Sequence, residues 1–338
     1  MIIVMKQAAS LKEISRVLQE IKTIGLKYFV SRGEQRSIIS LIGNGSSSEL
    51  KERLRILSGV EKIVPISKPF KLASREFKSE SSVVPVNGIS IGEKKVILMA
   101  GPCAIESREQ ILETAFAVKE AGVNILRGGA FKPRTSPYSF QGMKEKGLEL
   151  LKEVKEKTGL SVITEVMAPH QVPIVGEAAD IFQIGTRNMQ NYSLLEKVGK
   201  SNKPVMLKRG MVATIEEFLM AAEYILSNGN SNVILCERGI RTFEKFTRNT
   251  LDLASIPLLK QLSHLPVCVD PSHGTGMSSL IIPVSKASIA AGADCLLVEI
   301  HPNPKKALSD GFQSLDFKEF HRMVKELKPV AKSVNKNL

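Results

Sequence analysis

The sequence lacks the long apolar runs that mark membrane proteins. Hydrophobic residues make up 43% of its 338 residues, but no run approaches the roughly 20 apolar residues that span a bilayer. The opening stretch, residues 1–5, is short and leads directly into Lys6 and polar residues, unlike a secretory signal peptide. We therefore expect a cytoplasmic protein with no membrane partner.

Cysteine is also scarce. Four cysteines in a chain that we expect to be intracellular do not make a disulfide framework. Cys236, Cys268 and Cys295 lie in apolar, strand-like runs and are most simply small core residues. Cys103 differs because it follows Gly101-Pro102 at the end of such a run, where a side chain points into a loop region.

Aromatic residues are few, at 5% of the chain, and tryptophan is absent. The formal net charge, 47 − 34 = +13, would permit nucleic acid, a membrane surface or small anions as partners. In the first part of the chain, however, the cations alternate with anions along helical faces. No nucleic-acid motif with stacking aromatics occurs, so we expect no nucleic-acid partner.

The first 66 residues predict a small α/β unit. Strands are expected at 2–6, 26–30, 36–42 and 60–66, and helices at 10–24 and 47–57. This βαββαβ order is that of a ferredoxin-like sandwich, a fold with no single function. The polar and charged segment 67–82 is predicted to be a linker.

A regular alternation of short β-branched runs and amphipathic helices follows. An Asn87-Gly88 pair within 83–91 predicts a β-hairpin. Strands are then expected at 96–100, 123–126, 161–164, 181–184, 204–207, 232–236, 267–269 and 295–298, with helices that include 108–121, 145–158, 214–227 and 283–291. Eight βα units over 83–338 fit a (β/α)8 TIM barrel, which typically takes about 250 residues. The alternative, an open doubly wound sheet, would want a Gly-rich dinucleotide turn that the sequence lacks.

The segment 127–142 contains several closely spaced cationic side chains. It places Arg127, Lys132 and Arg134 within eight residues, with Pro133 fixing the backbone between two of them. Arginine offers a planar fork matched to carboxylate or phosphate, and lysine offers a point charge. One such cation would most simply lie on a solvated turn, but three together favour a site for a small, multiply anionic substrate.

Polar residues follow every predicted barrel strand, at the end where barrel active sites lie. They are Gly101-Pro-Cys103, Arg127, Glu165, Gly185-Thr-Arg187, Lys208-Arg209, Glu237-Arg238, Asp270-Pro-Ser-His273 and Glu299-Ile-His301. Six cations would converge on one mouth: Arg127, Lys132, Arg134, Arg187, Lys208 and Arg238. Held together they would repel one another unless anions were bound, so we expect ligands that carry phosphate and carboxylate.

A second group at the mouth consists of Cys103, His273, Glu299 and Asp310. One thiolate, one imidazole and two carboxylates suit a divalent transition metal, with borderline selectivity among manganese, iron, cobalt, copper and zinc. Because these residues come from different strands, their spacing does not reveal a site. A lone cysteine or histidine is more often structural, so only their convergence supports the metal.

These motifs resemble those of the 3-deoxy-D-arabino-heptulosonate 7-phosphate (DAHP) synthase family. The resemblance spans residues 68–330 and includes Gly-Pro-Cys103, Arg127-Gly-Gly-Ala-Phe-Lys-Pro-Arg-Thr-Ser136, Ile184-Gly-Thr-Arg187, Leu207-Lys-Arg209, Cys236-Glu-Arg-Gly239, Asp270-Pro-Ser-His273 and Val298-Glu-Ile-His-Pro302. It implies the first step of the shikimate pathway, in which phosphoenolpyruvate condenses with erythrose 4-phosphate and phosphate is released. The architecture resembles the microbial subgroup with a ferredoxin-like regulatory domain.

The resemblance also assigns residue roles. Phosphoenolpyruvate would contact Arg127, Lys132, Glu165, Gly185, Thr186, Arg187, Lys208 and Arg238, and erythrose 4-phosphate would contact Lys132, Pro133, Arg134, Thr135 and Ser136. One divalent ion (Mn²⁺, Fe²⁺, Co²⁺, Zn²⁺ or Cu²⁺) would be held by Cys103, His273, Glu299 and Asp310. The implied catalytic residues are Lys132, as the proton donor, together with Cys103 and His273.

Two other functions compete with this interpretation. The 3-deoxy-D-manno-octulosonate 8-phosphate synthases use the same barrel chemistry on arabinose 5-phosphate, and their loop characteristically reads Ala-Asn-Arg-Thr-Ser. Pro133 in place of that Asn favours the shorter sugar. A non-catalytic anion sensor is the second competitor, and the complete set of metal-type ligands argues against it.

The first domain resembles the feedback module of the subgroup. The resemblance implies inhibition by tyrosine or phenylalanine and a homotetramer, whereas the simpler alternative is a dimerisation or stability domain. Phe29 stands where members of the subgroup can carry a histidine, with Ser31 two residues on, so the choice of effector stays open.

Overall fold

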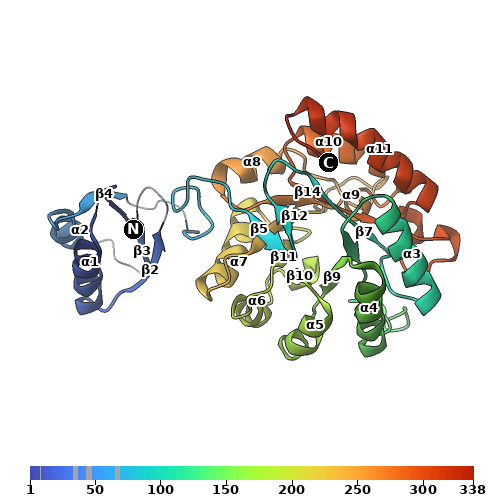
Figure 1. Ribbon diagram of the computed structural model, residues 1–338, viewed down its shortest axis with the longest axis horizontal. Coiled ribbons are helices and arrows are strands. Elements are labelled where there is room, and N and C mark those ends of the chain that lie inside the picture. Colours follow the sequence, from blue (N-terminus) through green and yellow to red (C-terminus); the bar gives the residue numbers. More distant parts are fainter. Residues whose placement is uncertain (8, 33–36, 43–47, 65–68) are drawn as a thin grey trace. The chain divides into compact units, whose positions relative to one another are not determined.

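The computed structural model describes residues 1–7, 9–32, 37–42, 48–64 and 69–338. The chain divides into two compact units, Met1–Ser79 and Glu80–Leu338 (Figure 1). Within the described ranges, no helix combines the length and the apolar character that a membrane span needs.

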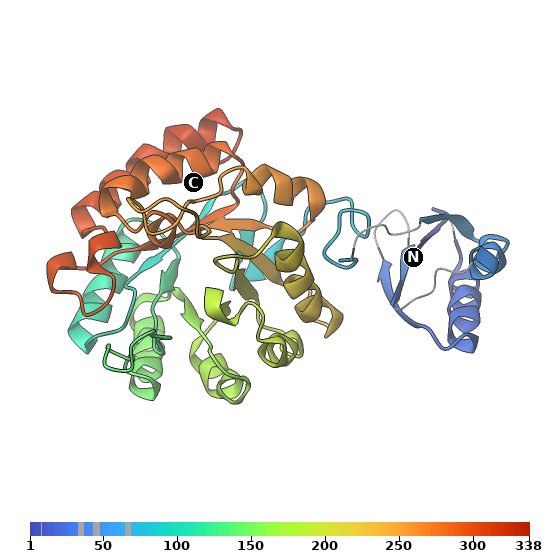
Figure 2. The ribbon, with the colours of Figure 1, turned by 180° about the vertical axis from the view of Figure 1, so that it is seen from behind.

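The first unit is the predicted ferredoxin-like sandwich. Its elements are β1 (Ile2–Met5), α1 (Leu11–Thr23), β2 (Lys27–Arg32), β3 (Ser37–Ile42), α2 (Ser48–Arg55) and β4 (Val60–Val64), with sheet order β2-β3-β1-β4. Both helices lie on one face of the sheet (Figures 1 and 2). Helix α1 begins with a capping box, in which the Ser10 hydroxyl accepts from the Glu13 amide and the Glu13 carboxylate accepts from the Ser10 amide at 2.8 Å.

The predicted linker, although polar in composition, buries several apolar side chains. Phe70, Leu72 and Phe77 are buried, and the Phe77 ring centroid lies 5.6 Å from that of Phe29. Residues 69–79 therefore belong to the first unit, and the boundary between the units falls inside the predicted segment. The charged neighbours dominate the composition of this stretch, but its few apolar side chains decide where it packs.

The second unit is the predicted TIM barrel. Its strands are β7 (Ile97–Gly101), β8 (Ile125–Arg127), β9 (Ser161–Glu165), β10 (Ile181–Ile184), β11 (Val205–Lys208), β12 (Val233–Glu237), β13 (Val267–Val269) and β14 (Cys295–Glu299). They are parallel and close in chain order, with β14 pairing with β7. The helices surround them (Figure 1): α3 (Arg108–Glu120), α4 (Glu145–Thr158), α5 (Val172–Ala178), α6 (Tyr192–Gly199), α7 (Ile215–Ser227), α8 (Ser255–Leu262), α10 (Ser278–Ala290) and α11 (Phe317–Ser333).

The predicted hairpin precedes the barrel as β5 (Val84–Val86) and β6 (Ile89–Ile91). Asn87 and Gly88 have φ of 44° and 81°, the left-handed pair that a two-residue type I′ turn requires. The apolar side chains of the hairpin pack into the same buried cluster as the side chains inside the barrel. That cluster also holds Cys236, Cys268 and Cys295, which confirms that these cysteines are core residues.

One predicted helix start is wrong. The sequence pattern predicts a helix over 283–291. Helix α10 begins instead at Ser278 and carries Pro283 inside it. Ile281 and Ile282 are buried on this helix. Their burial outweighs the single backbone hydrogen bond that the proline removes.

Candidate active site

A cavity of about 300 Å³ opens at the carboxyl ends of the barrel strands. Every residue that the sequence analysis assigned to a substrate lines it. The lining residues are Arg127, Lys132, Pro133, Arg134, Thr135, Ser136, Ser139, Glu165, Gln183, Gly185, Thr186, Arg187, Lys208, Met211, Arg238, Arg248, His273 and Asp310. The mouth is therefore strongly cationic, as the strand-end pattern predicts.

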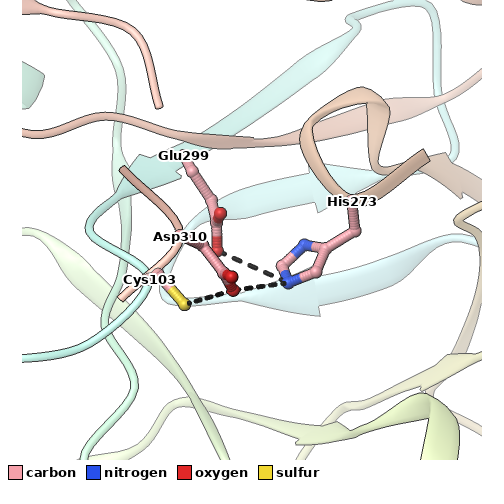
Figure 3. Close-up of side chains that lie close together, drawn as sticks. All are labelled: Cys103, His273, Glu299 and Asp310. Atoms are coloured by element: carbon pink, nitrogen blue, oxygen red, sulfur yellow. Dashed lines mark hydrogen bonds and ion pairs between the residues drawn. The ribbon is translucent and has the colours of Figure 1, made fainter. Parts of the chain in front are cut away.

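The four metal-type side chains point toward one another (Figure 3). One ligand atom from each of Cys103, His273, Glu299 and Asp310 lies within 4.8 Å of all the others. Cys103 Sγ is 3.2 Å from Asp310 Oδ2, and His273 Nε2 is 3.6 Å from Glu299 Oε1 and 4.0 Å from Asp310 Oδ2. Barrel closure brings them together, because β14, which carries Glu299, pairs with β7, which leads to Cys103.

The protonation of these groups follows from burial and from their neighbours. Burial lowers the pKa of His273 to about 4, so its ring is neutral at neutral pH. The Asp270 carboxylate accepts from Nδ1 at 2.8 Å, which leaves the bare Nε2 facing the other three ligands. Burial, with Glu299 adding to it, raises the pKa of the Cys103 thiol to about 11.

The two carboxyl groups are ionised despite their burial. Burial opposes the charge of Asp310, but Arg248 and the protonated form of His273 outweigh it and lower its pKa to about 2. Burial likewise opposes the charge of Glu299, but the protonated form of His273 and Arg127 overcome it, so its pKa is also lowered. A neutral imidazole, two carboxylates and a thiol that ionises on coordination form a donor set that fits a divalent first-row transition ion.

The expected mutual repulsion of the cations is partly relieved by carboxylates of the protein itself, which corrects the prediction that only bound anions would do so. Arg127 pairs with Glu299, and Lys208 pairs with Asp270. Lys132 Nζ donates to the Cys103 carbonyl at 2.8 Å. Barrel closure places these acids beside the cations, a pairing that adjacency along the chain does not indicate.

Arg238 is a buried cation with few hydrogen-bond partners. Its Nε is buried and has no hydrogen-bond partner within the described part of the chain. Its NH1 makes one long donation, to the Gly239 carbonyl at 3.4 Å. Burial lowers the pKa of this guanidinium. A buried donor left unpaired costs about 1–3 kcal/mol, so an anion bound in the cavity would relieve it.

Glycines make room for two functional side chains. A Cβ at Gly129 would lie 2.8 Å from Lys132 Cδ, and one at Gly185 would lie 1.9 Å from Glu165 Oε1. Glycine at these positions therefore lets Lys132 and Glu165 reach the cavity.

The loop that carries Arg134 is held by a hydrogen bond of its own, in which Arg134 Nε donates to the Phe140 carbonyl at 2.9 Å.

Some strand-end residues lie outside the cavity. Arg209 NH1 pairs with Glu237 Oε2 at 2.8 Å and with Asp252 Oδ2 at 3.0 Å. His301 Nε2 lies 3.3 Å from Glu106 Oε2. Side chains alternate along a strand, so Arg209 points away from the side on which Lys208 lies. His301 lies beyond the end of β14.

Sequence reasoning missed several residues around the site. Arg248, Gln183, Ser139 and Met211 line the cavity, and Asp270 orients His273. Asp270 had a usable signal, since it stands in the same strand-end motif as His273. Arg248 had none, because it lies in a loop well past β12 and reaches the cavity only through tertiary packing.

Fold and site together define a class of protein: a (β/α)8 enzyme whose mouth gathers cations beside a cluster of metal-type ligands. The DAHP synthetase I family model matches residues 76–336, and the DAHP synthase ferredoxin-like domain model matches residues 1–68. The chain is 50% identical over 331 residues to phospho-2-dehydro-3-deoxyheptonate aldolase of Thermotoga maritima, covering 98% of each protein. This chain therefore belongs to the DAHP synthetase I family and is an enzyme of the transferase type.

Solved structures and more distant relatives agree with this placement. The crystal structure of the Thermotoga maritima aldolase matches with a TM-score of 0.79 and 49% identity, covering 99% of this chain and 98% of that one. A 2-dehydro-3-deoxyphosphooctonate aldolase of Protochlamydia amoebophila is 31% identical and covers 75% of this chain and 98% of its own. A 2-dehydro-3-deoxyphosphooctonate aldolase of Francisella tularensis is 34% identical, and the match covers 71% of this chain and 94% of that protein.

Proposed function

We propose that this chain condenses phosphoenolpyruvate with erythrose 4-phosphate to give 3-deoxy-D-arabino-heptulosonate 7-phosphate and phosphate, in a metal-dependent reaction. The observation that carries the proposal is the cavity that the cationic loop 127–136 lines together with His273 and Asp310, two members of the four-ligand cluster. Two phosphorylated substrates need many cations, and a carbonyl that is to be attacked needs an electrophilic group next to it.

Phosphoenolpyruvate would bind deep in the cavity. Arg127 and Lys208 are buried and already oriented by their carboxylate partners, so they lose little freedom when an anion arrives. The unpaired Nε of Arg238 supplies a further donor for its phosphate or carboxylate. Arg187, Glu165 and the Gly185-Thr186 backbone complete this part of the lining.

Erythrose 4-phosphate would bind along Lys132, Pro133, Arg134, Thr135 and Ser136, with Arg134 on its phosphate. Lys132 lies between the two substrate regions and is buried. Its ammonium group is therefore the proposed proton donor to the oxygen that becomes a hydroxyl as the new carbon–carbon bond forms.

Cys103, His273, Glu299 and Asp310 would hold one divalent metal ion. When bound, the ion would supply Lewis-acid polarisation of the aldehyde or orientation of a water. The residues around it hold the substrates in line and keep both carboxylates ionised.

The proposal is tested by phosphoenolpyruvate consumption with erythrose 4-phosphate, before and after chelation and on addition of Mn²⁺. We expect rapid consumption that chelation abolishes and Mn²⁺ restores. Arabinose 5-phosphate is the matched control sugar, because relatives at 31–34% identity are named as phosphooctonate aldolases. Consumption with arabinose 5-phosphate alone would assign the chain to that reaction and remove the role given to Pro133.

The first unit is proposed to mediate feedback inhibition by tyrosine or phenylalanine. The match to a DAHP synthase ferredoxin-like domain supports this. Phe29 lies on β2 with 41% of its surface exposed; the side chain of Ser31 lies outside the described part of the chain. Activity of the full chain should fall with tyrosine or phenylalanine and not with tryptophan, and unchanged activity with both would contradict the proposal.

The same proposal includes a homotetramer in the cytoplasm. In such a tetramer an effector would bind between the first units of neighbouring subunits and change the activity of the barrel. Light scattering of the purified chain measures the oligomer directly, and a monomer at assay concentration would contradict this part.

A further inference from the structure

A two-residue segment after β12, Arg248-Asn249, contacts two of the four metal-type ligands and is connected to a third through Gln313. The Arg248 amide donates to the Thr275 carbonyl at 2.9 Å, and the Asn249 amide donates to the Gly274 carbonyl at 3.2 Å. Both acceptors belong to α9 (Pro271–Thr275), the short helix that carries His273. The segment is therefore fixed alongside that helix.

Space for the segment is provided by two glycines. A Cβ on Gly276 would lie 2.4 Å from Arg248 Cβ, and one on Gly239 would lie 2.7 Å from Asn249 Cβ. Both glycines have positive φ, at 70° and 87°, which L side chains rarely adopt. The backbone at Gly276 and Gly239 thus packs closely against Arg248 and Asn249, with no room for a larger residue at either glycine.

Gln313 connects the segment to Glu299. Its side chain is completely buried. Its Oε1 accepts from Arg248 NH1 at 2.6 Å, and its Nε2 donates to Glu299 Oε2 at 2.5 Å. A guanidinium can only donate and an ionised carboxylate can only accept, so an amide can connect them, whereas a carboxylate or an alkyl group at position 313 could not.

Each of these contacts uses the side of the ligand residue that faces away from the four-ligand cluster. Arg248 NH1 lies 3.4 Å from Asp310 Oδ1, while Asp310 Oδ2 faces Cys103. Gln313 holds Oε2 of Glu299, while Oε1 faces His273. Asn249 Nδ2 donates to the backbone carbonyl of His273 at 2.9 Å, which leaves the ring free.

We infer that Arg248, Asn249 and Gln313 are positioning residues of the metal centre. They hold both carboxylates and the His273 backbone in place, so that an arriving ion finds three donors already arranged. The inference rests on the proposed metal site and adds residues that touch none of the reacting atoms. Outer partners of this kind typically change metal affinity by about 10–100-fold.

The test measures Mn²⁺ affinity of the full-length, metal-stripped protein by equilibrium dialysis. Gln313→Leu and Arg248→Lys should each weaken Mn²⁺ binding by about 10–100-fold. Lys306→Ala is the matched control, because it removes an exposed cation from the loop that leads to Asp310; it should bind as the wild type does. With Co²⁺ as the probe, the thiolate charge-transfer band should shift in the two variants only.

A second readout separates positioning from substrate binding, because Arg248 also lines the cavity. At saturating Mn²⁺ the variants should keep a KM for phosphoenolpyruvate within about twofold of the wild type. A raised KM with unchanged Mn²⁺ affinity would overturn the inference and make Arg248 a substrate residue. Tight Mn²⁺ binding by the wild type and equally by both variants would overturn the inference alone, whereas a wild type that binds no Mn²⁺ would overturn the proposed metal site with it.

Discussion

Both units of this chain carry ion pairs at the surface, but among the described residues only the barrel also buries such pairs completely. In the barrel, Arg127–Glu299 and Lys208–Asp270 are ion pairs whose members are all at least 96% buried. In the first unit, the described pairs Arg53–Glu20 and Arg55–Glu52 are exposed. Both units bury an apolar core, so the difference does not come from folding alone. Buried charge is costly, and these two buried pairs of the barrel lie at the proposed active site.

The largest effect should come from the centre of the cavity. Lys132→Met should lower kcat by about 10²–10⁴-fold, because it removes the proposed proton donor. The melting temperature should stay close to that of the wild type. Steady-state kinetics and a thermal melt check both, and near-normal turnover would rule out the proton role.

A matched pair of substitutions sharpens the contrast between buried and exposed charge. Arg127→Met leaves Glu299 buried without its partner and should cost the barrel about 3–5 kcal/mol of unfolding free energy. Arg53→Met breaks an exposed pair and should change the first unit by about 0–1 kcal/mol. Denaturant unfolding measures both, and equal effects would remove the distinction drawn between the units.

A smaller effect is expected at the start of α1. Ser10→Ala removes the hydroxyl of the capping box and should cost the first unit about 1 kcal/mol. Turnover by the barrel without effector should not change. Unfolding monitored in each unit separately would detect the loss, and a reduced kcat would contradict the assignment of Ser10 to local stability.

The smallest expected effect is on the stability of the first unit at acid pH. Hydrogen bonds from Ser58 and Ser10 lower the pKa of Glu13 from 4.5 to about 2. Since the unfolded chain binds this proton more readily, the contribution of Glu13 to stability is fully present above pH 4.5 and is lost as pH falls toward 2. Glu13→Gln should flatten the pH dependence of the melting temperature, measured between pH 2 and 6. A slope equal to that of the wild type would contradict the contribution assigned to Glu13.

The sequence determined those features that depend on neighbours along the chain. Asn87-Gly88 predicted its hairpin because only a few residues adopt positive φ readily. The eight strands followed from their apolar runs. The polar residues after them, together with the loop 127–136, identified most of the cavity lining and three of the four metal-type ligands; Asp310 came from the loop after Glu299. Family motifs added the roles of individual residues, which remain proposals.

Tertiary structure decided which of these groups meet. Cys103 and Asp310 are 207 positions apart and lie 3.2 Å from one another only because the barrel closes. Arg248 and Gln313 have no signal in spacing, since their partners come from other loops. The same holds for the burial of Phe77 and for the early start of α10. Local patterns are fixed by bonded neighbours, whereas charge pairing and burial depend on contacts that exist only once the chain has folded.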